Sequence, residues 1–189
     1  MKKIGILGGT FNPLHIGHLA IAQAAQEKMG LDKIIFVPSA QPPHKRITHL
    51  ASAQDRLEMV CLSIKNNPNF DFSDYEVRKG GKSYTVDTVK HFYEEFGAGT
   101  KLFFILGGDA ACQLHTWRRV SEIIKYVTFI VVNRPGHDDC VSKIPHHSIT
   151  MPGLDISSSY VRGRILQGKS IKYLVPEEVF RYIESHKIY

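Results

Sequence analysis

Apolar runs rich in Ile, Val, Leu and Phe alternate with helical patterns along the whole chain. Short runs of this kind predict β-strands. The six predicted strands cover Lys3–Leu7, Lys33–Val37, Phe70–Phe72, Lys101–Leu106, Thr128–Val132 and Ser148–Met151. Several strands, such as the stretch Ile34–Val37, are apolar at every position instead of at every second one. This pattern indicates a parallel sheet with both faces covered by helices.

Segments with helical periodicity separate these strands. The predicted helices cover about Ile16–Met29, Ala53–Asn66, Thr85–Phe96, Asp109–Gln113, Val120–Lys125, Ser158–Gln167 and Pro176–His186. The repeated alternation of strand and helix predicts an α/β fold, a doubly wound, Rossmann-like parallel sheet of five or six strands with helices on both faces. No linker or internal repeat divides residues 1–189, so we expect a single domain.

Glycine-rich and polar segments follow the strongly apolar strands. Gly8-Gly9-Thr10 comes after the first strand, Gly107-Gly108-Asp109 after the fourth, and Asn133-Arg134-Pro135 after the fifth. In a doubly wound sheet, ligands bind beyond the carboxyl ends of the strands, near the point where the strand order reverses. We therefore expect the binding site at this edge of the sheet.

The segment from Gly8 to His18 carries the strongest chemical signal. Its glycines let the backbone approach a ligand closely, and the helix that begins at Ile16 is expected to point its first amides at an anion. His15 and His18, three residues apart, project from one side of the first turn. Two histidines can also bind zinc, but such a site needs further ligands, and no His or Cys cluster lies nearby in the sequence. Because no P-loop motif is present, we interpret the segment as a nucleotide site in which imidazoles replace the P-loop lysine.

Residues 155–162, with the sequence Asp-Ile-Ser-Ser-Ser-Tyr-Val-Arg, form a second informative segment. One serine is enough to cap a helix. Three hydroxyls followed by Arg162 can instead hold phosphate oxygens, with the guanidinium adding charge. We favour the phosphate interpretation over plain capping.

Together the two segments resemble the H-x-G-H and I-S-S-T-x-x-R motifs of the nucleotidyltransferase superfamily, and more narrowly those of the bacterial nicotinate-nucleotide adenylyltransferases. The resemblance covers nearly the whole chain. Supporting motifs are Gly8-Gly9-Thr10-Phe11-Asn12-Pro13, Pro42-Pro43-His44-Lys45, Ser83-Tyr84-Thr85, Gly107-Gly108-Asp109, Thr116-Trp117 and Asn133-Arg134-Pro135. Two departures are Asn12, where many members have Asp, and Ser159 in place of the usual Thr.

The resemblance implies adenylyl transfer from ATP to nicotinate mononucleotide, a step of NAD biosynthesis that gives deamido-NAD and pyrophosphate. It implies catalytic roles for His18, His15 and Arg134. The implied ATP-binding residues are Gly8, Gly9, Thr10, Phe11, His15, His18, Gly107, Asp109, Arg134, Ile156, Ser157, Ser158 and Arg162. The implied mononucleotide-binding residues are His44, Lys45, Tyr84, Thr85, Asp109 and Trp117. Mg²⁺ is expected to bind mainly through the ATP phosphates, without a protein metal site.

Several of these residues also have a simpler structural interpretation. Trp117 is either a ring that stacks on the pyridine or a core aromatic. Thr85 is an N-cap, a contact to the pyridine carboxylate, or both. Asp109 either binds a ribose hydroxyl or caps its helix, and Lys45 either clamps a phosphate or is a solvated loop residue.

Other functions remain open at this stage. Class I aminoacyl-tRNA synthetases share H-x-G-H, but this chain has no room for their additional domains and its second motif lacks their lysines. Phosphopantetheine adenylyltransferases more closely match T-x-G-H. Cytidylyltransferases and nicotinamide mononucleotide adenylyltransferases are the nearest enzyme alternatives, and a nucleotide-binding regulator without turnover is the alternative from another class.

The net charge indicates which kinds of partner to expect, and the cysteine content indicates the compartment. The net charge of +6 favours anionic ligands. Because the basic residues are scattered, small phosphorylated molecules fit better than nucleic acid. We expect Cys61, Cys112 and Cys140 to be reduced thiols in a cytoplasmic protein. Neither a signal peptide nor a membrane-length apolar stretch appears. The expected partners are ATP and nicotinate mononucleotide, with no membrane, and the chain acts alone or as a homodimer.

Overall fold

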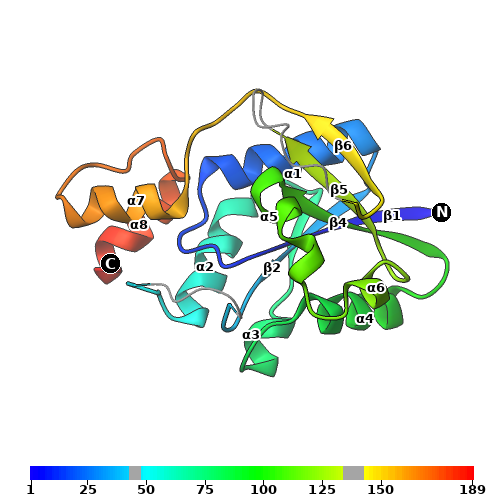
Figure 1. Ribbon diagram of the computed structural model, residues 1–189. Coiled ribbons are helices and arrows are strands. Elements are labelled where there is room, and N and C mark those ends of the chain that lie inside the picture. The colour runs from blue at the N-terminus through cyan, green and yellow to red at the C-terminus, as the bar shows by residue number, and fades with distance from the viewer. Residues whose placement is uncertain (43–47, 134–142) are drawn as a thin grey trace.

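The computed structural model describes residues 1–42, 48–133 and 143–189 (Figure 1). Within these ranges, six parallel strands form one sheet in the order β3-β2-β1-β4-β5-β6. The strands are β1 (Lys2–Gly9), β2 (Lys33–Pro38), β3 (Phe70–Phe72), β4 (Thr100–Gly107), β5 (Thr128–Asn133) and β6 (His146–Thr150). The predicted doubly wound α/β fold and all six predicted strands are confirmed, with small differences at the strand ends.

The helices also follow the predicted pattern. They are α1 (Ile16–Met29), α2 (Ala53–Ile64), α3 (Tyr75–Lys79), α4 (Thr85–Phe96), α5 (Gly108–Cys112), α6 (Val120–Ile123), α7 (Ser158–Leu166) and α8 (Glu177–His186), with a 3-10 turn, η1, at Leu114–Thr116. All seven predicted helices are present, whereas α3 and η1 were not predicted. None of the helices in the described ranges has both the length and the apolar character that crossing a membrane requires.

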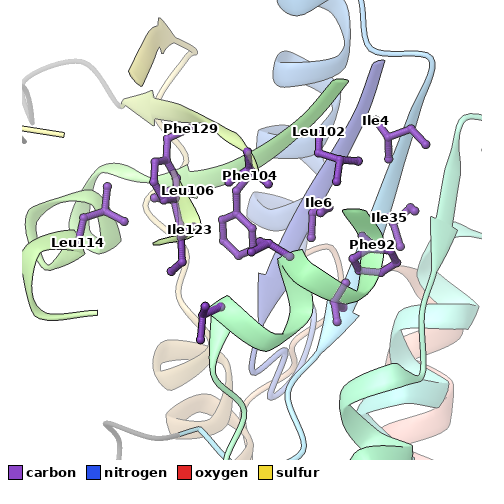
Figure 2. Packing of buried hydrophobic residues seen from close by; sticks show 14 of the residues in the cluster. Ile4, Ile6, Ile35, Phe92, Leu102, Phe104, Leu106, Leu114, Ile123 and Phe129 are labelled. Carbon is purple, nitrogen blue, oxygen red and sulfur yellow. The ribbon is translucent and has the colours of Figure 1, made fainter. Parts of the chain in front are cut away.

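Side chains of the central strands alternate between two apolar layers. In β4, Leu102, Phe104 and Leu106 pack into one layer, while Phe103 and Ile105 pack into the other. Residues of α4, α5 and α6 complete the first layer (Figure 2), and residues of α1 and α2 complete the second. Because both faces are apolar and covered, the strands carry hydrophobic residues at nearly every position.

The strand order reverses at β1. This strand pairs with β2 on one side and with β4 on the other. Its carboxyl end carries Gly8 and Gly9, and β4 ends at Gly107. Helices α1 and α5 begin just beyond these ends, at the edge of the sheet where the sequence predicts a ligand site.

The last two helices lie beside α2 (Figure 1). A third apolar cluster joins Met59 of α2 to Val161 of α7 and Val179 of α8. Tyr182 of α8 also donates a hydrogen bond to Asp55 of α2 at 3.0 Å. These contacts hold the start of α7 in a fixed place relative to the sheet.

The cysteines only partly match the expectation of free thiols. Cys61 is free, but Cys112 at the end of α5 is disulfide-bonded. Cys140 lies outside the described residues. Disulfide pairing depends on how close two Cα atoms come in the fold, which wide spacing along the chain does not reveal.

Candidate active site

The two histidines of the H-x-G-H motif lie in contact at the start of α1. His15 is the N-cap residue and His18 belongs to the first turn, with ring centroids 3.8 Å apart. The backbone N–H of His15 donates to Nδ1 of His18 at 3.2 Å. Because Nδ1 accepts this bond, the neutral ring of His18 carries its proton on Nε2. That nitrogen is then a donor suited to a phosphate oxygen.

Two neighbours fit closely around the histidine pair. A Cβ atom on Gly17 would lie 3.0 Å from Nδ1 of His15, so a larger residue at this position would press on that imidazole. The buried ring of Phe11 packs edge-on against His18, with centroids 5.1 Å apart. Phe11 lines neither of the cavities described below. Its side chain therefore supports His18, and a contact of Phe11 with ATP stays a prediction.

Two backbone amides at the start of α1 donate hydrogen bonds to carbonyls within the protein. The Ile16 N–H donates to the carbonyl of Leu174 at 3.0 Å, and the His18 N–H donates to the carbonyl of His15 at 2.9 Å. The expectation that these two amides point at an anion is therefore wrong. The imidazole of His18 is the better candidate donor at this helix start.

A first cavity, of about 320 Å³, opens beside the histidine pair. It lies at the carboxyl edge of the sheet, where α1, α5 and α7 begin. Its walls include seven residues predicted to bind ATP: His15, His18, Gly107, Asp109, Ile156, Ser157 and Ser158. The motifs near the two ends of the chain thus meet around one cavity.

The polar groups at the start of α7 have different partners. Ser157 is the N-cap and accepts a backbone hydrogen bond within α7 at 3.1 Å. Ser158 Oγ donates to the carbonyl of Pro13 at 2.9 Å. Arg162 donates to the carbonyl of Asn12 at 2.8 Å and does not line the first cavity. Its guanidinium holds the turn that leads into α1, and its expected contact with the ATP phosphates stays a prediction.

A second cavity, of about 350 Å³, lies at the same edge of the sheet. Its walls come from the end of β1, the start of α4 and the segment after α5. They include Gly8, Gly9 and Thr10, predicted for ATP, and Tyr84, Thr85, Asp109 and Trp117, predicted for the mononucleotide. The predicted mononucleotide residues in the described ranges therefore share one cavity.

Trp117 belongs to both the core and this second cavity. Its indole packs edge-on against Phe104 and Phe129, with centroids at 5.8 Å and 6.4 Å. Core packing therefore fixes the ring at the cavity wall. Its stacking on the pyridine stays a prediction. Thr85 is the first residue of α4, whereas Tyr84 is the N-cap, so the expectation that Thr85 caps the helix is wrong.

Three charged side chains line the second cavity among the described residues: Glu76, Asp109 and Arg118. Glu76 is buried in α3 and accepts a hydrogen bond from the Thr88 hydroxyl. Burial raises the pKa of its carboxyl, and hydrogen bonds from Ser83 and Thr88 oppose this shift. Neither Glu76 nor Arg118 was assigned to the site from the sequence, because neither belongs to a local motif.

Asp109 lines both cavities, which therefore meet at the start of α5. Gly107 is the N-cap of α5 and Asp109 lies in its first turn, so Asp109 does not cap the helix. Ligands in the two cavities would approach each other beside this carboxylate.

The sequence profile of the cytidylyltransferase-like family matches residues 6–164. A Lactiplantibacillus plantarum protein named as a nicotinate-nucleotide adenylyltransferase is 43% identical over 188 residues, covering 100% of this chain and 88% of that protein. The chain belongs to the nicotinate-nucleotide adenylyltransferase family. A relative of the same name from Desulfitobacterium hafniense is 42% identical, covering 100% of this chain and 96% of that protein.

The fold of this family member is shared by solved structures. The Plasmodium falciparum nicotinic acid mononucleotide adenylyltransferase complexed with APC has a TM-score of 0.81 at 22% identity, covering 100% of this chain and 97% of that chain. The same protein complexed with NaAD has a TM-score of 0.80 at 21% identity. At this identity, the likeness shows the fold: a parallel sheet with helices on both faces.

The hydrogen bonds of Asn12 explain why this chain carries an amide where many family members have Asp. Its Oδ1 accepts from the Ala51 N–H at 3.0 Å and from the Tyr189 hydroxyl at 2.7 Å. Its Nδ2 donates to the carbonyl of His49 at 3.1 Å. An ionised Asp cannot donate this last bond. The side-chain amide of Asn12 therefore suits this turn, because it donates one hydrogen bond and accepts two.

Arg56 is a second structural residue that the sequence did not reveal. Its side chain is 1% exposed and donates to the carbonyls of Thr10, Ser39 and Ala40. Burial lowers the pKa of its guanidinium. An arginine within an amphipathic helix normally predicts a solvated position, so local pattern gives no sign of this burial.

Three residues assigned to the site from the family resemblance, Arg134, His44 and Lys45, lie outside the described residues. Their roles at the triphosphate and at the mononucleotide phosphate stay predictions.

Proposed function

We propose that this protein transfers the adenylyl group of ATP to the phosphate of nicotinate mononucleotide, forming deamido-NAD and releasing pyrophosphate. The observation that carries this proposal is the meeting of two cavities at Asp109, one lined by the histidine pair and one by Trp117. Transfer of an adenylyl group from one substrate to another requires that the two binding sites adjoin. The names of the curated relatives support the same reaction.

Each cavity suits a different substrate. The first has imidazoles and serine hydroxyls, which are donors for phosphate oxygens, and we assign the ATP to it. The second has a fixed indole at its wall, suited to an aromatic ring, and we assign the nicotinate mononucleotide to it. Thr10, which directly follows β1, lines the second cavity and leads into the turn before His15.

The chemistry needs no strong general base, because the phosphate of the mononucleotide is largely ionised near neutral pH. One of its oxygens attacks the α-phosphorus of ATP. A new P–O bond forms, the bond to the β-phosphate oxygen breaks, and its electron pair leaves with pyrophosphate. Nε2–H of His18 donates to an α-phosphate oxygen, where it stabilises the developing charge.

The first cavity also suits ATP that arrives with Mg²⁺. The carboxylate of Asp109 and the hydroxyls of Ser157 to Ser159 are hard oxygen donors of the kind that Mg²⁺ prefers. We expect the ion to be held mainly by phosphate oxygens and water, and when bound it would neutralise the triphosphate. The protein residues would then position the phosphates.

A paired assay tests the proposal. Pyrophosphate release is measured with ATP and Mg²⁺, using nicotinate mononucleotide in one arm and nicotinamide mononucleotide in the other. We expect efficient turnover with nicotinate mononucleotide. Turnover of neither compound, despite nucleotide binding, would indicate a regulator and contradict the proposal.

Replacing ATP by CTP in the same assay distinguishes the transferases. The cytidylyltransferase-like profile makes this arm necessary, since it names a different nucleotide. We expect a strong preference for ATP. A preference for CTP would assign the protein to cytidylyl transfer.

A further inference from the structure

We propose that Arg118 is a specificity-determining residue whose guanidinium selects an anionic pyridine ring in the second cavity. This inference rests on the proposed function and assigns the larger part of its choice between a pyridine carboxylate and a neutral carboxamide to one side chain. Three observations carry it: the placement of the guanidinium, the charge balance of the cavity and the lack of an acidic partner for Arg118 in the described ranges.

The guanidinium of Arg118 is held at the cavity wall by an aromatic ring. Its central carbon lies 4.5 Å from the centroid of Tyr84, which is the N-cap residue of α4. Stacking of this kind attracts the cation and leaves the N–H groups at its edge available. Both side chains line the second cavity, next to Trp117. A ring that packs against Trp117 would therefore place its substituent within reach of a planar, bidentate donor.

Charge within the cavity makes this cation necessary for an anionic ligand. Among the described lining residues, Arg118 is the sole cation, and it stands against the carboxyl groups of Glu76 and Asp109. Without Arg118, the charged groups of the described lining would be acidic only, and they would disfavour a pyridine carboxylate. The affinity for a neutral carboxamide would change far less.

Arg118 is not neutralised by an acidic side chain in the described part of the chain. The contrast is its neighbour Arg119, which forms an ion pair with Glu122 and does not line the cavity. The two arginines are adjacent in sequence, yet of the two only Arg118 lines the cavity. Arg119 is therefore a matched control.

Backbone amides at the start of α4 favour an anion as well, because the start of a helix carries a partial positive charge. The guanidinium of Arg118 adds a full positive charge and two parallel N–H donors that match a carboxylate. We therefore assign the larger part of the discrimination to Arg118.

The test compares kcat/KM for nicotinate and nicotinamide mononucleotides in the wild type, Arg118→Gln, Arg118→Lys and Arg119→Gln. We expect Arg118→Gln to lower kcat/KM for the nicotinate compound by about tenfold or more, through KM, while the nicotinamide value changes less than about threefold. Arg118→Lys should retain part of the selectivity because it keeps the charge but loses the bidentate geometry. Arg119→Gln should leave the ratio unchanged.

The outcomes separate this inference from the proposed function. Equal losses for both mononucleotides in Arg118→Gln, or an unchanged ratio, would overturn the role of Arg118 while leaving the adenylyl transfer intact. A wild type that turns over neither mononucleotide would overturn the proposed function itself. Thermal unfolding of each variant shows whether the fold is retained, which we expect because Arg118 is exposed.

Discussion

At the scale of single residues, hydrogen bonds decide which atoms remain available for chemistry. The N–H of His15 occupies Nδ1 of His18 and thereby assigns the ring proton to Nε2. Arg162 donates to the carbonyl of Asn12 and to the Ser159 hydroxyl, which leaves further N–H donors on its guanidinium. We therefore place charge stabilisation at His18 and the positioning of the preceding turn at Arg162, whose role at the ATP phosphates stays a prediction.

Substitution of His18 by alanine tests this assignment. We expect His18→Ala to lower kcat at least about a hundredfold, roughly 3 kcal/mol of transition-state stabilisation, with a small change in KM. Steady-state kinetics with ATP and nicotinate mononucleotide measure both constants. Near-normal turnover would remove His18 from the chemical step.

Residues within a local motif were predictable, and residues that act through the tertiary structure were not. His15 and His18 were identified because one turn of helix places them together. The hydrogen bond from Arg162 to Asn12 spans 150 positions, so no window of the sequence contains it. The same reason explains why Glu76 and Arg118 were missed.

The pH dependence of stability tests the burial of Glu76. Because its pKa is raised above the ordinary value of 4.5, the folded state holds this proton more tightly than the unfolded state. The wild type therefore loses stability as the pH rises from 4.5 through the raised pKa. Glu76→Gln lacks this titration, so its stability relative to the wild type should increase with pH. Denaturant unfolding at about pH 5 and about pH 8 measures the difference; a constant difference, or a decrease, would contradict the raised pKa.

At the scale of elements, the strands and the long helices follow from the hydrophobic pattern, whereas the shortest helices were predicted only in part: α5 and α6 were predicted, and α3 was not. The fully apolar strands and the periodic helices α1, α2, α4 and α8 have clear signals. Helix α3 is only five residues long, too short for a periodicity to appear. Its position matters nevertheless, because it brings Glu76 to the second cavity.

Arg56 connects elements, and its removal should be costly. The guanidinium of this α2 residue binds carbonyls that follow β1 and β2. We expect Arg56→Met to lower the free energy of unfolding by about 3 kcal/mol, since buried carbonyls lose their donor. The control is Arg78→Met, because Arg78 is exposed and pairs with Asp74 at the surface; we expect it to change stability by less than about 0.5 kcal/mol. Equal effects in denaturant unfolding would contradict the structural role of Arg56.

At the scale of the whole molecule, the carboxyl-terminal residues support the amino-terminal motif. The hydroxyl of Tyr189 donates to Asn12, and the carbonyl of Leu174 accepts from Ile16. Both contacts hold the turn and helix that carry the histidine pair. The hydrophobic pattern predicted a doubly wound parallel sheet. The contact between the two ends of the chain, in contrast, depends on how α7 and α8 pack against α2.

Loss of the terminal hydroxyl should therefore weaken the fold. We expect Tyr189→Phe to lower the free energy of unfolding by about 1 kcal/mol, the value of one partly buried hydrogen bond. Tyr173→Phe is the control, because Tyr173 is 78% exposed. Denaturant unfolding of the two variants gives the comparison, and equal stabilities would show that the contact with Asn12 contributes nothing.

Competition by deamido-NAD tests most directly whether the two cavities form one reaction centre. A dinucleotide that spans both cavities must displace ATP from the first and nicotinate mononucleotide from the second. Calorimetric titration of each substrate into protein saturated with deamido-NAD measures whether that substrate can still bind. We expect binding of both substrates to be abolished; an unchanged Kd for either one would contradict a single centre joined at Asp109.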